Sequence, residues 1–365
     1  MEAGILTGEE VHIIRPIWEE VFAEDSKTFT DYYFENKAER NLVLIRKDGE
    51  QIAAMLHLTP YVTGECRPVS YIVGVATKEA YRRRGLMRSL LEEALQFLWE
   101  EGHGFTFLMP ANPAYYSPFD FAYIYDKKSY TINSQILPVH ILDRAAEQEA
   151  SFHLLVKDYG TLDIAVAKEQ DYAEICTYVN QKLAKESDCF MLRTPLYYDT
   201  LKKELLAQNG NLFLIRKDGK TAGVLAYTKE EDKPGIQEWI GDTKLVECGL
   251  VEEGADKPCI MGRIVNVKEF LEALAWQTAD FYLEVNDSII KENTGVYHIQ
   301  SGLAEKTTTT KQWDVSVDIG RLTEFCFGRK NAGECFVFRK EKEANIRQQL
   351  EQVCRIRNTF INEIV

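Results

Sequence analysis

Several features that mark other protein classes are missing from this sequence of 365 residues. No apolar run approaches the roughly 18 residues that a membrane-spanning helix needs, and the first residues lack the basic and apolar segments of a signal peptide. The eight cysteines form no Cys-x-x-Cys pair, and the six histidines show no paired metal-ligand spacing. No Gly-x-Ser-x-Gly turn or Walker loop occurs. We therefore expect a reduced, cytoplasmic protein with no bound metal and no membrane partner.

Positive charge is also scarce. The 43 lysines and arginines face 57 aspartates and glutamates, which gives a formal charge of −14. That balance disfavours binding to nucleic acid or to an anionic membrane, and it suits a cationic small molecule or a basic peptide. Solubility alone also favours acidic surfaces, so the charge does not decide the matter. The length predicts two or three domains.

An internal repeat organises the first two-thirds of the chain. Residues 41–49 and 211–219 are identical except for Val43 against Phe213, and each stretch ends in Asp-Gly before a second apolar segment. Strand, Asp-Gly and strand predict a hairpin with a type I′ turn, which needs positive φ at its central residues. Helical periodicity precedes the two hairpins, over residues 9–22, 29–36 and 169–183. We therefore predict two related α+β units.

Only the first unit continues into a strand, a loop, a helix and a second strand. The apolar residues 71–76 predict the first strand, residues 86–101 an amphipathic helix, and residues 105–109 the next strand. A βαβ unit of this kind predicts that the two strands run parallel. The second unit has no arginine-glycine loop after its hairpin. It is predicted to have kept the sheet and lost the site.

The loop before that helix carries three consecutive arginines and a glycine, Arg82 to Gly85. Backbone N–H groups and the positive end of the helix dipole can hold a pyrophosphate there. Gly85 allows a close backbone approach, and the arginines add charge and forked donors. Three arginines alone would more often be a solvated patch. The apolar strand before them and the amphipathic helix after them favour the anion site.

These residues resemble a known family. Val73-Gly74-Val75-Ala76 and then Tyr81-Arg82-Arg83-Arg84-Gly85-Leu86 are similar to motif A of the GNAT acetyltransferases, whose loop reads Gln/Arg-x-x-Gly-x-Gly/Ala. Met87 departs from the small third residue of that pattern. The resemblance implies acetyl-coenzyme A as cosubstrate and no metal. The residues that it implies for cofactor binding are Val73, Val75, Arg82, Arg83, Arg84, Gly85, Leu86 and Met87.

The segment Arg-Arg-Arg-Gly-Leu followed by a large residue is similar to the corresponding loop of the enhanced intracellular survival (Eis) family in particular. That family implies an α+β fold of tandem GNAT domains, with mixed sheets flanked by helices and a degenerate second copy, followed by a sterol-carrier-protein-like α+β domain. On this sequence the expected domains are residues 1–135, 136–256 and 257–365. The family also implies a homo-oligomer, a trimer or a hexamer.

Two catalytic positions are implied by the same resemblance. The family's acid tyrosine falls on Tyr116, in a segment that departs from the family pattern and leaves Tyr115 as the alternative. The family's C-terminal carboxylate, its base, falls on Val365. Tyrosine, with an ordinary pKa of about 10, suits proton donation to a thiolate whose thiol has a pKa of about 8.5. A carboxylate with a pKa of about 3.5 is a weak base, so it would act through water or by holding the ammonium.

The N-terminal helical region often lines the acceptor pocket of GNAT enzymes. Trp18, Asp25 and Phe29 lie there, and acidic and aromatic side chains suit a cationic amine. His57 lies on a strand near the expected cleft, where an auxiliary role is conceivable.

The resulting hypothesis is an N-acetyltransferase that moves acetyl from acetyl-coenzyme A to a primary amine of an aminoglycoside, polyamine, lysine or peptide. The alternative is a lipid-binding or scaffolding protein that works through its sterol-carrier-like domain. That alternative needs an open apolar cavity, whereas the enzyme needs the chain end in the first domain's cleft.

Overall fold

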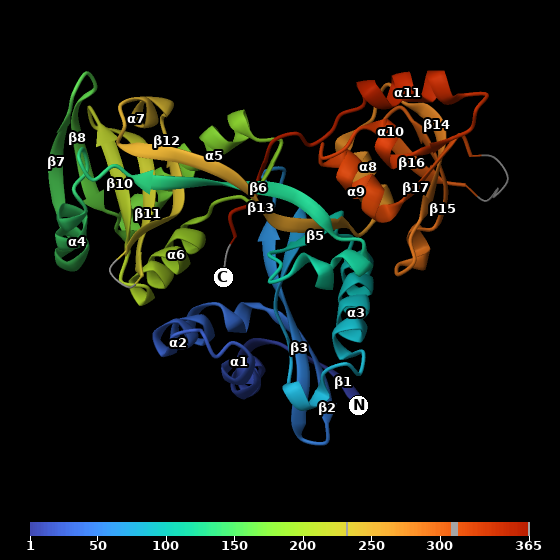
Figure 1. Ribbon diagram of the computed structural model, residues 1–365, viewed down its shortest axis with the longest axis horizontal. Helices are drawn as coiled ribbons and strands as arrows, with labels where there is room; N and C mark the ends of the chain where they lie inside the picture. The colour runs from blue at the N-terminus through green and yellow to red at the C-terminus, as the bar shows by residue number, and fades with distance from the viewer. Residues whose placement is uncertain (231–232, 308–312, 364–365) are drawn as a thin grey trace.

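The computed structural model describes residues 1–230, 233–307 and 313–363. Three sheets lie in three lobes of an elongated molecule (Figure 1). The first lobe occupies the lower centre, the second lies to the left and the third to the right. The mixed sheets flanked by helices confirm the predicted α+β class.

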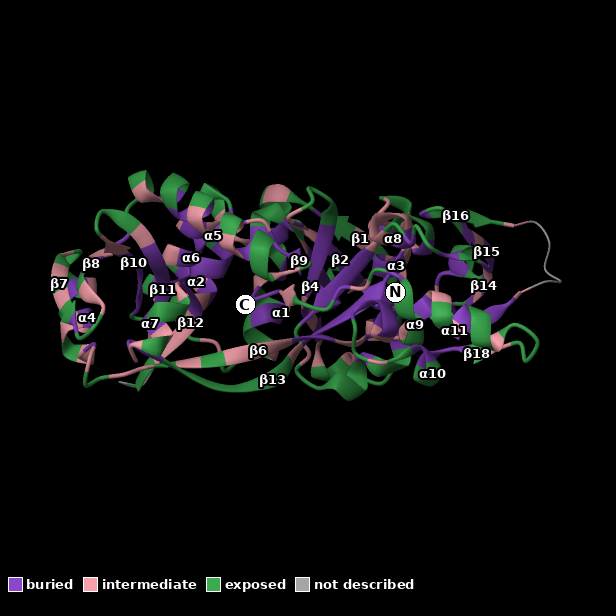
Figure 2. Ribbon diagram, turned by 90° about the horizontal axis from the view of Figure 1, so that it is seen from above, coloured by how far each residue is buried: buried purple, intermediate pink, exposed green. Residues whose placement is uncertain are grey.

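The first sheet is mixed and has the order β1-β2-β3-β4-β5-β13-β6. Its strands are β1 (Glu2–Leu6), β2 (Leu42–Asp48), β3 (Gln51–Val62), β4 (Pro68–Thr77), β5 (Phe105–Leu108), β6 (Ala122–Ile132) and β13 (Val251–Ile264). β4 and β5 pair in parallel, as the βαβ pattern predicted. The connecting helix α3 (Leu86–Glu100) buries one apolar face on this sheet, and Figure 2 shows buried strands, in purple, at the centre of the molecule.

Two short helices cover the other face, namely α1 (Arg15–Val21) and α2 (Lys27–Asn36). The sequence predicted one helix over residues 9–22, but a 3-10 helix, η1 (Gly8–Ile14), comes first. Pro16 lies at the start of α1. Proline lacks the N–H that a continuous helix would need there, so the α-helix begins at that point instead of earlier.

The second sheet repeats the hairpin in the order β12-β11-β10-β8-β7. Its strands are β7 (Ser151–Val156), β8 (Gly160–Val166), β10 (Asn211–Lys217), β11 (Lys220–Glu230) and β12 (Lys233–Gly241). Its helices are α4 (Val139–Gln148), α5 (Tyr172–Glu186), α6 (Pro195–Ala207) and α7 (Thr243–Glu247). Helices α5 and α6 precede this hairpin as α1 and α2 precede the first one. The sequence repeat is therefore a structural repeat.

The two central residues of the turn lie one position later in the first hairpin than in the second. In the second copy Lys217 pairs with Lys220, and both central residues, Asp218 and Gly219, have positive φ as a type I′ turn requires. In the first copy Asp48 pairs with Gln51, which moves the turn to Gly49 and Glu50. Of those two residues only Gly49 has a positive φ. The type I′ prediction is thus confirmed for the second hairpin and wrong for the first.

Strands β6 and β13 cross the molecule as a long antiparallel pair that links the first two lobes (Figure 1). At one end β13 enters the first sheet beside β5, where Met261 pairs with Leu108. The middle of β13 is exposed and its last five residues are buried. Residues 257–264, expected in the third domain, therefore contribute a strand to the first sheet.

The third sheet has the order β16-β15-β14-β17-β18. Its strands are β14 (Asp280–Asn286), β15 (Gly295–Gln300), β16 (Leu303–Lys306), β17 (Val315–Asp318) and β18 (Val337–Phe338), and its helices are α8 (Val267–Leu274), α9 (Ile319–Cys326), α10 (Ala332–Cys335) and α11 (Glu343–Gln352). Trp276, Phe281 and Phe325 fill the interior, each only 1% exposed. The chain then returns to the centre, where β19 (Thr359–Phe360) pairs with β9 (Cys189–Phe190).

Candidate active site

A bulge interrupts β4 in the middle of the first sheet. Met55 pairs with Ala76 and His57 with Val73, so Gly74 and Val75 lie opposite a single residue of β3. Gly74 has a φ of +58°, and a Cβ placed on it would come within 2.7 Å of Cζ3 of Trp18. Only glycine fits both the backbone angle and the close approach of the indole.

Beyond the bulge, β4 and β5 separate. Their parallel pairing is limited to Ser70 with Thr106 and Tyr71 with Phe107, although β4 continues to Thr77. The bulge and the early end of β5 at Leu108 leave the edge of β4 around Val73 and Val75 without β5 beside it. Backbone N–H groups on such an edge are free to bind a carbonyl oxygen.

The arginine loop follows β4 directly. A short 3-10 helix, η3 (Glu79–Tyr81), leads to Arg82, whose Nε donates to the Thr77 carbonyl oxygen over 3.3 Å. Arg84 Nη2 donates to the Ala80 carbonyl oxygen over 2.9 Å, and the guanidinium covers the Tyr81 ring. All three arginine side chains are exposed. The loop is therefore shaped by local contacts while its cations face solvent.

Gly85 begins α3 in the left-handed conformation, with φ +78° and ψ 12°, and no side chain caps this helix end. A Cβ on Gly85 would meet no atom within 4 Å, so the backbone angle, not space, requires glycine. Leu86 is buried and Met87 half-buried against the core. An uncapped helix N-terminus facing three arginines is an anion-binding arrangement.

The repeated arginine of the hairpin fixes α3 against the sheet. Arg46 Nη2 donates to Glu93 over 2.5 Å, and its Nε donates to the Ser89 hydroxyl over 3.0 Å. In the second unit the matching Arg216 instead binds Asp171 and Glu174 beside α5. The same sequence motif thus holds the cofactor-loop helix in one unit and a different helix in the other.

Tyr116 lies between two short 3-10 helices that follow β5, η4 (Pro113–Tyr115) and η5 (Ser117–Phe119). It is 7% exposed and packs against Phe121, whereas Tyr115 is 56% exposed. Burial raises the pKa of Tyr116 to about 12. The phenol therefore stays protonated at neutral pH and can act as a proton donor.

The three expected acceptor contacts lie on the α1–α2 face. Trp18 is 3% exposed, touches the Gly74 bulge and donates from Nε1 to Asp25 over 3.0 Å. Burial raises the pKa of Asp25. Phe29 is half-buried beside Tyr32. Trp18 therefore reaches the bulge from within the core, and Asp25 joins it through a hydrogen bond.

His57 is completely buried between the sheet and these helices. Its Nδ1 lies 3.0 Å from the Tyr33 hydroxyl and 3.2 Å from the Asn41 amide nitrogen, so Nδ1 is the acceptor and Nε2 carries the proton. Within the described residues Nε2 has no partner. Burial lowers the pKa of His57 to about 3.

We expect His57 to make stability depend on pH. The unfolded imidazole has a pKa near 6.5, so the unfolded state binds the proton more readily, and stability falls as the pH decreases from about 6.5 to 3. The loss should approach about 1.4 kcal/mol per pH unit. Urea denaturation at several pH values between 7 and 5 measures how the free energy of unfolding falls as the pH decreases. In His57→Gln that fall should be smaller than in the wild type, by up to about 1.4 kcal/mol per pH unit. His140→Gln, at an exposed histidine, is the control. Identical slopes for wild type and His57→Gln would contradict it.

The end of the chain lines a cavity of ≈ 250 Å³ between the first and second lobes, here called the tail cavity. Asn362 and Glu363 form one wall. The other lining residues are Lys37, Arg40, Thr59, Pro60, Tyr61, Val62, Leu192, Thr194, Leu196, Tyr197, Thr200, Leu201, Glu204 and Gln237. The apolar end of the sequence is buried up to Glu363, as predicted. Val365, the expected base, lies outside the described residues.

Glu204 is the polar centre of that cavity, and the sequence analysis missed it. It accepts hydrogen bonds from Lys37 Nζ over 2.6 Å, from the Tyr32 hydroxyl over 3.0 Å and from Gln237 Nε2 over 2.7 Å. These partners come from both units of the repeat. The sequence of α6 does not distinguish Glu204 from an exposed glutamate, because its hydrogen-bond partners are more than 30 residues away. No sequence signal could have identified it.

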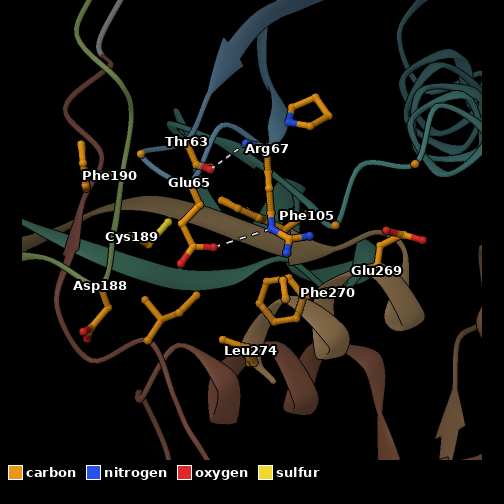
Figure 3. A pocket seen from close by; sticks show the side chains of 16 residues that line it. Thr63, Glu65, Arg67, Phe105, Asp188, Cys189, Phe190, Glu269, Phe270 and Leu274 are labelled. Atoms are coloured by element: carbon orange, nitrogen blue, oxygen red, sulfur yellow. Dashed lines mark hydrogen bonds and ion pairs between the residues drawn. The ribbon is translucent and has the colours of Figure 1, made fainter. Parts of the chain in front are cut away.

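A smaller cavity of ≈ 170 Å³ lies where the third lobe meets the first (Figure 3). Phe105, Phe270 and Leu274 line its apolar side, and an ion pair of Glu65 with Arg67 at 3.6 Å lies across from them (Figure 3). Ligand sites for drug-sized molecules usually measure about 300–1,000 Å³. The volumes of this cavity and of the tail cavity are both below that range.

Two further observations concern partners. Among the described residues, no helix is both long and apolar enough to cross a membrane. The same residues contain no group of three or more histidine, cysteine, aspartate or glutamate side chains placed to hold a metal ion.

Comparison with known proteins assigns the first and third lobes. Residues 4–124 match the acetyltransferase (GNAT) domain family, and residues 267–354 match the sterol carrier protein domain family. No curated protein matches this sequence.

Three solved structures are similar over the full length. The first is a conserved protein from Enterococcus faecalis described as a probable N-acyltransferase, with a TM-score of 0.76 and 18% identity over 100% of this chain and 99% of that chain. The second is a GCN5-related N-acetyltransferase from Anabaena variabilis, with a TM-score of 0.72 and 16% identity over 100% of both chains. The third is Eis1 from Mycobacterium abscessus, with a TM-score of 0.68 and 12% identity over 100% of both chains. At these identities the likeness shows the fold.

The family matches define the class of protein. The lobe with the β4 bulge and the arginine loop is a GNAT acetyltransferase domain. The lobe with the third sheet is a sterol carrier protein domain. The protein is therefore an enzyme, an acetyltransferase that also carries a sterol-carrier-type domain.

Proposed function

We propose that this protein is an N-acetyltransferase of the Eis type that transfers acetyl from acetyl-coenzyme A to a primary amine on a cationic acceptor. The observation that carries the proposal is the continuous arrangement of bulge, separated strands and arginine loop on a GNAT domain. Support for the Eis type comes from the arginine-glycine sequence, the repeated unit and the sterol carrier domain. The homo-oligomer, a trimer or hexamer, stays an expectation of that resemblance.

The residues present suit the phosphates of coenzyme A. Gly85 leaves open space at an uncapped helix end, and Arg82, Arg83 and Arg84 bring exposed guanidinium groups to it. Val73 and Val75 lie on the β4 edge that has lost its partner strand, where backbone N–H groups would bind the thioester oxygen. The cosubstrate supplies the activated acetyl group.

In the mechanism that we propose, the chain's own groups orient the reactants and move protons. Attack by a neutral amine forms the C–N bond and breaks the C–S bond, and Tyr116 gives its proton to the departing sulfur. Because burial raises the pKa of Tyr116 to about 12, the phenolate would regain a proton rapidly. The carboxylate of Val365 would accept the amine's proton through water.

The α1–α2 side of the sheet is where we place the acceptor. Trp18 and Asp25 lie there beside the bulge, and the tail cavity lies at the end of α2. Aromatic faces and carboxylates stabilise ammonium groups. An aminoglycoside, a polyamine, a lysine side chain or a peptide N-terminus would all present such a group.

Free-thiol release from acetyl-coenzyme A, measured with a panel of amines, tests the proposal. We expect amine-dependent release, and we expect Arg82→Gln to raise KM for acetyl-coenzyme A by about tenfold or more, since a charge-assisted hydrogen bond contributes about 1.5–3 kcal/mol. Arg67→Gln, at the cavity beside the third lobe, is the matched control. Silence with every amine, together with no thermal stabilisation by coenzyme A, would favour the lipid-binding or scaffolding alternative.

A further inference from the structure

A buried arginine joins the second unit to the end of the chain. The side chain of Arg193, between β9 and α6, is 0% exposed, as is that of Glu363, and that of Glu238 on β12 is 2% exposed. Arg193 Nη2 donates to Glu238 Oε2 over 2.7 Å, and Nη1 donates to Glu363 Oε1. One cation thus lies between two carboxylates, one of which belongs to the chain's final residues.

Arg193 is held rigidly by its surroundings. Its backbone exchanges two hydrogen bonds with the side chain of Asn180 on α5, of 2.9 and 2.8 Å. Its guanidinium lies 4.1 Å from the centre of the Tyr197 ring and 5.6 Å from that of Phe360. An arginine fixed at both ends can set the position of whatever carboxylate it binds.

Stability does not explain this cluster. It contains one positive and two negative buried charges, and Glu238 Oε1 and Glu363 Oε2 have no hydrogen-bond partner in the described chain. Burial raises the pKa of Glu363, although Arg193 opposes that change. Removing such charges from water costs as much as the pairing returns, so apolar packing would serve stability equally well. What an ion cluster adds is one defined position for its members.

The preceding tail residues are fixed by the same unit. Asp188 accepts hydrogen bonds from the backbone N–H groups of Arg357 and Asn358 over 2.8 and 3.0 Å. β19 then pairs with β9, and Asn362 Nδ2 donates to the Gln237 carbonyl oxygen over 3.0 Å. The tail therefore runs along the second unit in one register until it reaches the tail cavity.

We propose that Arg193 is a positioning residue for acetyl transfer: through Glu363 it fixes the last described residues of the chain at the tail cavity, and so it limits where the C-terminal carboxylate that we propose as base can act. This inference rests on the proposed function. It gives the second unit, which lacks the arginine loop, a defined role in the reaction of the first.

The test compares two arginines of the second unit, Arg193 and Arg216, each of which binds two carboxylates. Arg193→Lys should lower kcat by about 10–100-fold and leave KM for acetyl-coenzyme A within about twofold, because a small misplacement of a reacting group has effects of that size. Arg216→Lys, whose partners Asp171 and Glu174 are remote from the tail, is the matched control. Equal kcat values in both variants and wild type would overturn the inference.

A double-mutant cycle separates positioning from general damage. In a chain extended by two glycines after Val365, Arg193→Lys should lower kcat no further, because both changes act through the same carboxylate. Effects that multiply would contradict the inference. If the extension itself leaves kcat unchanged, the proposed role of the carboxylate fails; if the extension lowers kcat and Arg193→Lys does not, only the positioning role fails.

Hydrogen exchange supplies a readout without catalysis. Amides of residues 359–363 should exchange at least about tenfold faster in Arg193→Lys and keep the wild-type rate in Arg216→Lys. Unchanged protection in Arg193→Lys would overturn the inference. Should Arg193→Lys not fold, Glu363→Gln carries the same comparison, since it keeps the side-chain shape and removes the charge that Arg193 binds.

Discussion

Tyr116→Phe is expected to lower kcat by about 100-fold to 10,000-fold and to leave KM for acetyl-coenzyme A nearly unchanged, as loss of a general acid does. The substitution removes one hydroxyl from a 7% exposed ring and keeps the contact with Phe121. Cofactor binding is unaffected because the arginine loop is a separate segment. Steady-state kinetics of thiol release over both substrates would measure the two parameters.

Tyr115→Phe is the comparison for that experiment. Tyr115 is the adjacent tyrosine and the alternative acid, and it is 56% exposed. A large loss in Tyr115→Phe with normal kcat in Tyr116→Phe would transfer the role to Tyr115. The pH profile gives a second check: with the pKa of Tyr116 raised to about 12, ionisation of this group cannot reduce kcat between pH 7 and 10. Deprotonation would begin to matter only as the pH approaches that value.

Extension of the chain after Val365 should also reduce kcat by about 100-fold or more, because it removes the free carboxylate from its proposed place and general bases contribute effects of that size. Two added glycines suffice, since they turn the α-carboxylate into a peptide carbonyl. Ile361, Asn362 and Glu363, which precede the added residues by a few positions, are buried.

The matched control for this experiment adds the same two glycines before Met1. β1 pairs only with β2 at the edge of the first sheet, remote from the tail cavity, so activity should be unchanged. Thermal denaturation of both extended proteins would show whether the fold is intact. Full activity in the protein extended at Val365 would exclude the carboxylate as base and leave solvent in that role.

The position of the sterol carrier protein domain bears on the alternative function. Its interior is occupied by Trp276, Phe281 and Phe325, and the small cavity of Figure 3 lies at its contact with the acetyltransferase domain. Strand β13 leads directly from the first sheet into α8 of this domain. After α11 the chain leaves this domain, and β19 pairs with β9 of the second unit.

The sequence by itself determined the local elements of the catalytic half. Helix α3 follows from apolar residues at helical spacing, and the parallel strands follow from the βαβ order. The arginine loop and Gly85 are adjacent in the chain, so their chemistry could be read directly. The repeat was visible because eight of nine residues recur in each hairpin. Such features depend on neighbours within a few residues, which a sequence displays.

Tertiary structure alone decided where the distant segments meet. The separation of β4 from β5 arises from a bulge in one strand and the early end of another, and neither has a sequence mark beyond Gly74. β13 leaves the second unit to enter the first sheet, although its residues fall in the expected third domain.

The tail cavity is the clearest example of an arrangement that only the tertiary structure decided. Glu204 and Glu363 line it, Arg193 and Glu238 form an ion cluster with Glu363, and a sequence places all four of these charged residues on the surface. Folding buries each of them because it finds a partner of opposite charge on another segment. Burial of a charge depends on a partner up to 170 residues away, and periodicity carries no information about such a partner.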